Sequence, residues 1–345
     1  MSPSLVLLLY MVSFNALALT KVQKGLTPYP GYKPSLSKRS CYPVDLTPKM
    51  GPVRDQEAGS CYAYAAIELL NYGQEKTYSA LYLAHMHNVP NTKIPLEKLS
   101  GLNGGIVLSA LKVAFSKGLC EEAVPSKNHQ LIIDYYMKKK KLACSSLELS
   151  DIILHPLASL DKFLIKSVVH ETYPNLDPAY VEITYNRATD PNAFFNEIAT
   201  SGCKGRVMKG VPIGKSAEDI RESSIIVRTP DGKFISEHNR VKLVVHLNSA
   251  LDNQFPVAVT VMSEGMILPP NENGEHNSHA LTVVGRQWNN GSCYYLLKNS
   301  WGTEWKVQDG LKAINTEKPG HILVSEKNLM EHTDNIISLD NQKIP

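Results

Sequence analysis

The pattern of apolar and polar positions divides the chain into a helical early part and a strand-rich late part. From Cys61 to about Tyr72, apolar and small residues recur every three or four positions, which predicts a helix that Ser60 can cap and Gly73 can end. Residues 78–88 predict a second helix. Residues 107–117 predict a third helix that ends at the breaker Gly118.

Beyond Val241 the pattern changes. Residues 241–251 are typical of a helical or mixed segment, and residues 255–262 alternate like a strand. Residues 279–288 and 293–301 predict two more strands, and Asn289-Asn290-Gly291 between them suits a tight turn. Residues 290–292 also form an N-glycosylation sequon, although the turn explains these residues without a sugar. Helices followed by strands favour an α+β fold of two packed halves.

The middle of the chain, residues 121–240, predicts no clear architecture. Helices are expected near 128–141 and 159–170. A hairpin is expected from RESSIIVRT and KFISE, which flank the Pro-Asp-Gly turn at 230–232.

The N-terminus has the pattern of a secretory signal. Leu5 to Phe14 is almost wholly apolar, and Ala16-Leu17-Ala18 supplies the small residues of a cleavage site, so we expect a signal peptide over residues 1–18. No Lys or Arg precedes the apolar run, which is atypical. Residues 19–41 are expected to be a leader or an extended arm, in which Lys38-Arg39 is a dibasic pair that a protease could cut. The expected location is therefore secreted or periplasmic, without a membrane span.

Composition narrows the function classes. The 345 residues are 43% hydrophobic and 20% charged, as in ordinary globular proteins, and a net charge of +3 is too weak to indicate nucleic acid as a partner. Six cysteines can pair in an oxidising compartment, and Cys120–Cys144 is the one pairing that we predict. No cysteine spacing predicts a metal site, and His85 and His87 lie two residues apart on a predicted helix, so they face different directions.

Three residues in separate segments suggest nucleophilic chemistry. Cys61 begins a helix, where unpaired N–H groups and the helix dipole stabilise a thiolate. His279 opens one predicted strand and Asn299 ends the next, so a hairpin would bring both side chains to one rim of a sheet. A thiol, an imidazole that accepts its proton and a polar group that orients the imidazole form a nucleophilic triad.

These residues stand in motifs that resemble the papain-like cysteine peptidases. The motifs are Q-x-x-x-G-S-C-Y-A-Y, N-G-G at 103–105, N-S-H-A-L-T-V-V-G and K-N-S-W-G-T-E-W, in the order of the family. The resemblance implies a two-lobed fold with the active-site cleft between a helical lobe and an antiparallel strand-rich lobe. It places one peptidase domain with four parts over 42–345. They are a helical lobe at about 42–120, an insertion at 121–240, a strand-rich lobe at about 241–315 and a C-terminal extension at 316–345.

The resemblance also implies a role for each motif residue. Cys61 resembles the nucleophile, His279 the general base and acid, and Asn299 the residue that orients the imidazole. Trp301 resembles the indole that shields the His–Asn hydrogen bond, and Gln56 resembles the side-chain donor of the oxyanion hole.

Substrate-binding residues follow from the same resemblance. Gly104 and Gly105 match the glycines beside the extended substrate, where a side chain would obstruct the approach of the peptide. Ile106, Val107, Thr260 and Ala280, with Trp301, are implied to line the binding site, which would accept a hydrophobic residue at P2.

The sequence departs from the family pattern in several places. The loop from Gln56 to Cys61 is one residue shorter than usual, so the reach of Gln56 is open. The two cysteines of one family disulfide are replaced together, by Ala58 and Leu102. The stretch between Cys61 and His279 exceeds the roughly 130–150 residues of the family pattern, and the leader is too short for a full inhibitory prosegment.

The sequence therefore predicts a secreted cysteine endopeptidase that works through a thioester acyl-enzyme and needs no cofactor. Its expected partners are polypeptide substrates and a proteinaceous inhibitor, and it is expected to act as a monomer. Two alternatives stay open. One is a catalytically impaired peptidase-like binding protein, and the other is an amidase or acyltransferase that uses the same triad on cell-wall peptides.

Overall fold

The computed structural model describes about half of the chain. The described residues are 32–34, 36–54, 56, 60–88, 105–121, 178–187, 203, 216–224, 226–228, 234–236, 240–269 and 278–339. The helices predicted near 128–141 and 159–170 lie outside these ranges. The chain divides into a helical unit, Lys49–Ile220, and a strand-rich unit, Met1–Pro48 with Arg221–Pro345.

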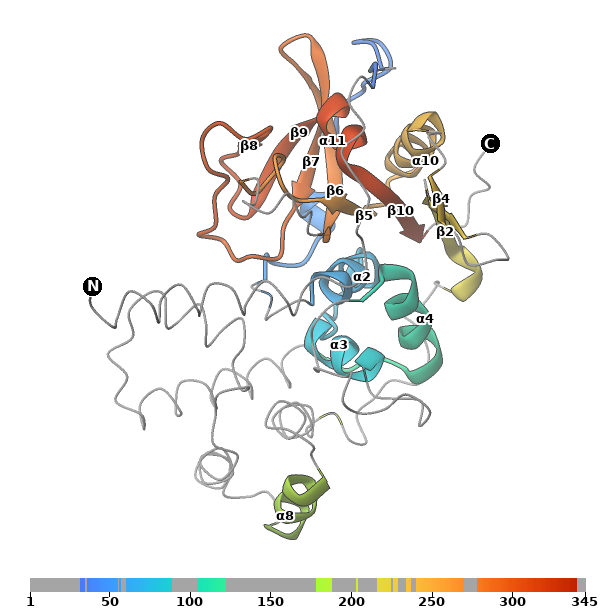
Figure 1. Cartoon of the computed structure of the whole chain (residues 1–345), viewed down its shortest axis with the longest axis vertical. Helices are drawn as coiled ribbons and strands as arrows, with labels where there is room; N and C mark the ends of the chain where they lie inside the picture. Colours follow the sequence, from blue (N-terminus) through green and yellow to red (C-terminus); the bar gives the residue numbers. More distant parts are fainter. Residues whose placement is uncertain are drawn as a thin grey trace, which may run out of the picture. The chain divides into compact units, whose positions relative to one another are not determined.

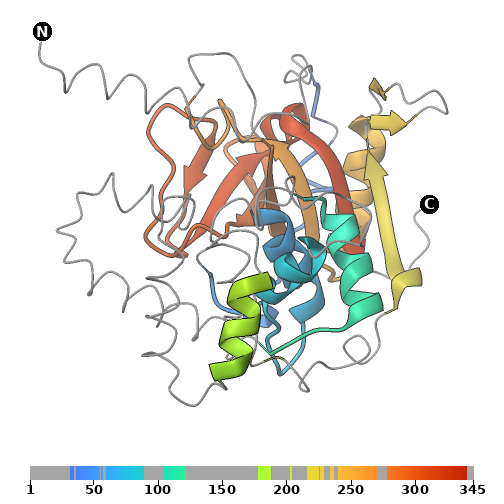
Figure 2. The ribbon, with the colours of Figure 1, turned by 60° about the horizontal axis from the view of Figure 1, so that its bottom comes forward.

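The helical unit is built on three helices that contact one another, α2 (Cys61–Asn71), α3 (Ala80–Asn88) and α4 (Val107–Lys117) (Figure 2). All three predicted helices are confirmed. Helix α3 begins two residues later than the pattern indicates, because the Ser79 hydroxyl accepts the N–H of Tyr82 at 3.1 Å and so caps the first turn. The further described elements of this unit are α8 (Pro178–Arg187) and the 3-10 helix η4 (Ala217–Asp219).

Tight packing explains the small residues of α2. Ala63, Ala65 and Ala66 are all buried, as are Leu69 and Leu70, so nearly the whole helix surface is covered. Such a helix is stabilised by burial on all sides rather than along one stripe.

The strand-rich unit contains an eight-stranded sheet among the described residues, in the order β2-β10-β5-β6-β7-β9-β8, with β1 beside β6 (Figure 1). The strands are β1 (Val44–Asp45), β2 (Ile220–Ser224), β5 (Val257–Met262), β6 (Ser278–Asn289), β7 (Ser292–Lys298), β8 (Ala313–Asn315), β9 (His321–Ser325) and β10 (Thr333–Leu339). The 3-10 helix η1 (Thr47–Lys49) follows β1. Helices α10 (Arg240–Asp252) and α11 (Glu326–His332) pack on the sheet and on each other.

The predicted strands and turns are found where the pattern places them. β6 and β7 form an antiparallel hairpin, in which Asn290 and Gly291 have φ values of 44° and 79° at the turn. β3 (Ile226–Arg228) pairs with β4 (Phe234–Ser236), which confirms the hairpin expected around 230–232. Helix α10 confirms the helical interpretation of 241–251. The α+β class is thereby confirmed.

Strand β5 differs from its prediction as an alternating strand. Every residue of β5 except Thr260 is buried, because the strand lies inside the sheet between β10 and β6 while α10 and α11 pack against it. A strand covered in this way is apolar at successive positions instead of at every second one.

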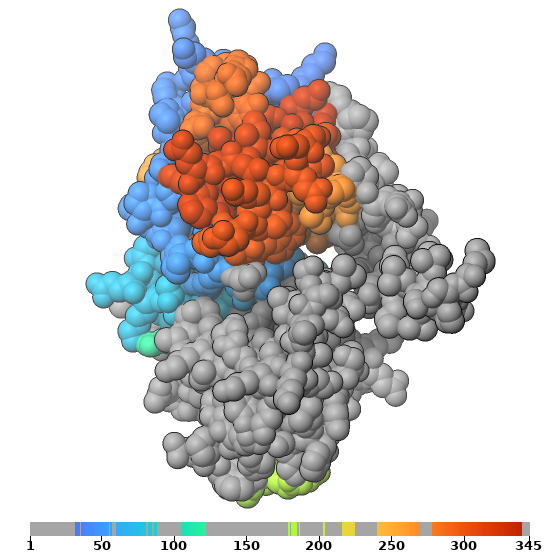
Figure 3. Space-filling view, turned by 90° about the vertical axis from the view of Figure 1, so that its left-hand side faces the viewer, coloured from blue at the N-terminus to red at the C-terminus, as the bar shows by residue number. Residues whose placement is uncertain are grey.

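The limits of the strand-rich half also differ from the predicted ones. Residues 316–345, expected to be an extension, supply β9, α11 and β10, and both strands lie within the sheet order. At the other end, β1 pairs with β6 through Val44 and Asp45, so residues before Pro48 group with the strands. Figure 3 shows one face of this unit, where the late strands, in orange and red, form a continuous surface.

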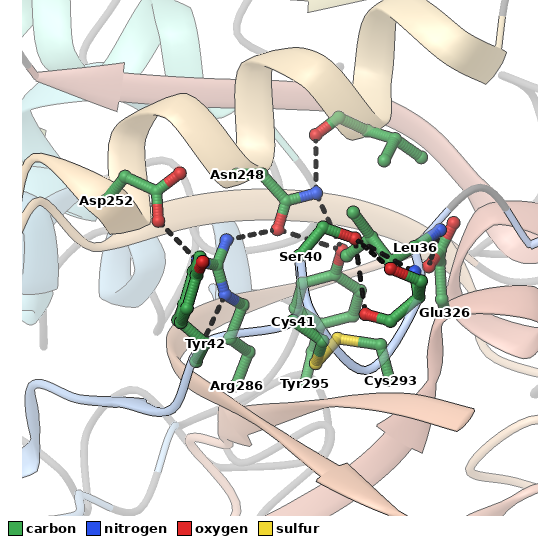
Figure 4. The surroundings of a disulfide bond; sticks show 12 residues. Leu36, Ser40, Cys41, Tyr42, Asn248, Asp252, Arg286, Cys293, Tyr295 and Glu326 are labelled. Carbon is green, nitrogen blue, oxygen red and sulfur yellow. Dashed lines mark hydrogen bonds and ion pairs between the residues drawn. A yellow bond between two sulfur atoms is a disulfide. The ribbon is translucent and has the colours of Figure 1, made fainter. Parts of the chain in front are cut away.

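A disulfide and a buried arginine hold the N-terminal arm, here the described residues up to Tyr42, on the sheet (Figure 4). Cys41 bonds Cys293 of β7, with a Cα–Cα distance of 5.8 Å. Arg286 of β6 donates from Nε to the Tyr42 carbonyl at 2.8 Å and from Nη1 to Asn248 Oδ1 of α10 at 2.6 Å. The arm is therefore fixed by covalent and polar contacts that residues far apart in the sequence supply.

The predicted pairing of Cys120 with Cys144 is wrong. Cys120 bonds Cys203 instead, with a Cα–Cα distance of 5.7 Å, and this disulfide packs against Tyr82 and Met86 of α3. Pairing depends on which Cα atoms the fold brings within about 7 Å, and the short sequence interval between Cys120 and Cys144 does not determine that. Among the described helices, none is both long and apolar enough to cross a membrane.

Candidate active site

Cys61 is the first residue of α2, as the sequence predicts. Its side chain is partly exposed and forms no disulfide. The carbonyl of Ser60 accepts the N–H groups of Ala63 and Tyr64 at 2.8 and 3.2 Å, which starts the helix, although the Ser60 side chain makes no capping hydrogen bond. The thiol therefore lies at the positive end of an eleven-residue helix, where a thiolate is stabilised.

Gly105 lies against the residue that follows Cys61. A Cβ added to Gly105 would come within 2.5 Å of ring atoms of Tyr62, whose side chain is 1% exposed. The ring of Tyr62 is in turn tilted against the ring of His87, with centroids 4.9 Å apart. The glycine is thus required by close packing on Tyr62, in addition to the substrate approach that the sequence motif implies.

The remaining predicted residues of the helical unit differ in exposure. Ile106 is 61% exposed, whereas Val107 is 2% exposed, so of the two only Ile106 presents its side chain to solvent. Gln56 is half-buried. Gly104 lies outside the described residues.

In the strand-rich unit, His279 and Asn299 meet as the hairpin prediction requires. His279 is the second residue of β6 and Asn299 directly follows β7, and the antiparallel pairing of these strands joins His279 Nε2 to Asn299 Oδ1 at 2.8 Å. The backbone N–H of Ser300 donates to the same Oδ1 at 2.8 Å. This contact orients the Asn299 amide, so Nε2 carries the proton and Nδ1 of His279 is left as the basic nitrogen.

Two tryptophans cover this pair. The ring of Trp301 stacks on the ring of His279, with centroids 4.2 Å apart and an interplanar angle of 25°. Trp305 meets Trp301 edge-on at 4.8 Å. Sequence reasoning gave Trp305 no role, although it ends the K-N-S-W-G-T-E-W motif, which is the signal that could have identified it.

Burial sets the charge state of His279. The side chain is 4% exposed, and this burial lowers the pKa of the imidazole to about 4, while the hydrogen bond to Asn299 acts in the opposite direction. Without a negative partner the ring is therefore neutral at pH 7, which is the state a general base requires.

Thr260 and Ala280 lie beside this pair. They are directly opposite each other in the β5–β6 register, next to the Val261–His279 pair. Thr260 is half-buried and Ala280 is 5% exposed. The strand register therefore brings these two predicted pocket residues together with the histidine. Among the described residues, no cluster of three or more His, Cys, Asp or Glu side chains could hold a metal ion.

Comparison with known proteins agrees with this geometry in the strand-rich half. Residues 229–331 match the profile of the papain family cysteine proteases, a segment that includes His279, Asn299 and both tryptophans. This segment of the chain is therefore similar to the papain family. The match covers under a third of the chain and does not reach Cys61 or Gln56.

Solved structures also match. One is the digestive procathepsin L 3 of the Tenebrio molitor larval midgut, which is 16% identical, with a TM-score of 0.41, and the match covers 95% of this chain and 79% of that chain. Both values are low, and the likeness assigns no role to any residue. The comparison with curated proteins found no match.

Proposed function

We propose that the chain is an extracytoplasmic cysteine endopeptidase that uses Cys61, His279 and Asn299 as its triad. The observation that carries the proposal is the buried imidazole of His279, oriented by Asn299 and covered by Trp301. Such an arrangement fixes the tautomer and leaves one basic nitrogen, which is what a nucleophilic thiol requires of its partner. The two disulfides support a location outside the cytoplasm.

In the proposed reaction, Nδ1 of His279 takes the proton of the Cys61 thiol. The thiolate that forms is stabilised by the N-terminus of α2 and by the imidazolium, whose pKa its negative charge raises. The sulfur attacks the scissile carbonyl, and the backbone N–H of Cys61 and the Gln56 amide stabilise the oxyanion. His279 then protonates the leaving amine, and water activated by the same ring hydrolyses the thioester.

Substrate recognition is proposed to follow the same assignment. The backbone beside Gly105 would pair with an extended peptide, and Ile106, Thr260 and Ala280 would favour a hydrophobic residue at P2. The exposed Ile106 and the adjacency of Thr260 and Ala280 in the sheet support this assignment. The natural partners would then be polypeptides, and a proteinaceous inhibitor would bind at the same place.

The test combines labelling with turnover. An electrophilic epoxide should label Cys61 in the wild type, and the label should be lost in Cys61→Ala and strongly reduced in His279→Ala. Casein hydrolysis should disappear in both variants, while Gln56→Ala should keep a weak residual activity, since losing one oxyanion donor costs about 10²–10³ in kcat. His321→Ala, on β9 of the same sheet, serves as the matched control and should keep full activity.

The outcomes separate the proposal from its rivals. Hydrolysis of casein by Cys61→Ala at the wild-type rate would refute the mechanism. Labelling without turnover of any peptide would indicate a binding protein. Cleavage of peptidoglycan fragments in place of casein would indicate an amidase with the same triad.

A further inference from the structure

The turn between β6 and β7 is exposed at its two central residues. Asn289 pairs with Ser292 at the ends of the strands, and Asn290 and Gly291 form a two-residue turn with both φ values positive. Asn290 and Gly291 are exposed, whereas Cys293, which follows, is 1% exposed. The hairpin therefore offers the Asn290 side chain to solvent, although Cys293 of the adjoining strand is buried.

The same residues spell an acceptor for N-linked sugar. Asn290-Gly291-Ser292 has the form N-x-S with a residue other than proline in the middle, and no other position in the chain has this form. A bulky glycan is compatible with an exposed surface turn and incompatible with a buried strand. Here the sequon coincides with the exposed tip of a hairpin.

We propose that Asn290 is an N-glycosylation site. In the transfer, the side-chain amide nitrogen of Asn290 attacks C1 of an oligosaccharide carried on a lipid pyrophosphate. A C–N bond forms, the C1–O bond to the pyrophosphate breaks, the lipid pyrophosphate leaves and the amide gives up one proton. The reaction consumes no oxidant or reductant.

The adjoining disulfide controls when the acceptor is available. Cys293 lies directly beyond the sequon and bonds Cys41, which is 252 residues earlier in the chain and is therefore synthesised first. Closing this disulfide fixes the start of β7 and with it the turn, and an acceptor held in a closed turn is harder for a transferase to extend. Glycan transfer therefore competes with formation of the Cys41–Cys293 bond.

The experiment is expression of the full chain through a eukaryotic secretory pathway, followed by treatment with an N-glycan-removing amidase. The wild type should shift to faster mobility on a denaturing gel. Asn290→Gln and Ser292→Ala should migrate at that faster position without treatment. Asn289→Gln is the matched control, since Asn289 has no Ser or Thr two residues later, and it should shift like the wild type.

The role of the disulfide is tested by Cys41→Ser, which leaves the sequon intact. The fraction of the intracellular chain that carries glycan should rise, a measurement that does not require the variant to fold. An unchanged fraction would refute the competition. A wild-type chain that does not shift, beside a co-expressed glycoprotein that does, would overturn the site itself. Neither outcome bears on peptidase activity, because Asn290→Gln should hydrolyse casein like the wild type.

Discussion

Replacing Gly105 by alanine should destabilise the helical unit through a clash with Tyr62. The new Cβ would lie 2.5 Å from Cε2 and Cζ of the Tyr62 ring and 2.7 Å from Cδ2. Carbon atoms pack at about 3.5–4.0 Å, so backbone or ring must move by about 1 Å. The Tyr62 ring is buried and lies against His87, which limits its movement. Overpacking of this kind costs about 1–3 kcal/mol, and 2 kcal/mol corresponds to roughly 4–8 °C in Tm.

Thermal unfolding followed by circular dichroism measures this cost. Gly51→Ala is the matched control in the same unit, because a Cβ there would meet Thr77 Cγ2 at 3.6 Å and Arg54 Nη2 at 3.9 Å, which are ordinary contacts. The control should change the stability by less than about 0.5 kcal/mol.

A double-mutant cycle identifies the cause. Gly105→Ala should cost less in a Tyr62→Leu background, where the smaller side chain leaves room for the new methyl group. Equal costs in the two backgrounds, or equal losses from Gly105→Ala and Gly51→Ala, would refute the assignment of the clash to the Tyr62 ring.

Three further predictions concern the strand-rich unit. Asn299→Ala should lower kcat/KM by about 10–100-fold, since a hydrogen bond to a charged group contributes about 1.5–3 kcal/mol. Asn299→Asp places a carboxylate beside the imidazole and should raise the pKa of His279, which an NMR titration of the ring protons would show. In Cys61→Ala, the free energy of unfolding should fall by about 1.4 kcal/mol for each unit by which the pH is lowered from 6.5 to 4.5. Burial lowers the pKa values of His279 and His246 to about 4, so in this range each histidine binds a proton in the unfolded chain but not in the folded one. Burial raises the pKa of Asp334 to about 7, so this carboxyl holds a proton only in the folded chain and cancels the contribution of one histidine. A flat urea-denaturation profile over this range would contradict the linkage. Gly285→Ala should separate β1 from β6, because its Cβ would clash with the Val44 carbonyl oxygen. Faster hydrogen exchange at β1 would show the separation.

Much of the fold could be predicted because its signals are local. The helix of Cys61, the helix 107–117 and the Asn-Asn-Gly turn each follow from a few consecutive residues. The His279–Asn299 contact could be predicted as well, since a tight hairpin fixes the register of the two strands that carry it.

What could not be predicted depends on contacts between distant segments. Cys120 pairs with Cys203, and the burial of β5 depends on helices and strands that come before and after it. The polar cluster around Arg286 joins β6, α10 and the arm, and no local pattern signals it. The steric need for Gly105, which precedes α4, likewise arises from Tyr62 of helix α2.

The most direct test of the account is the pKa of His279 measured by NMR of its ring protons in the wild type and in Cys61→Ala. If thiol and imidazole exchange a proton, the thiolate keeps the ring charged, and the wild type should titrate at a much higher pH than the variant, whose pKa should be about 4. The same titration curve in both proteins would contradict the proposed pairing of Cys61 with His279.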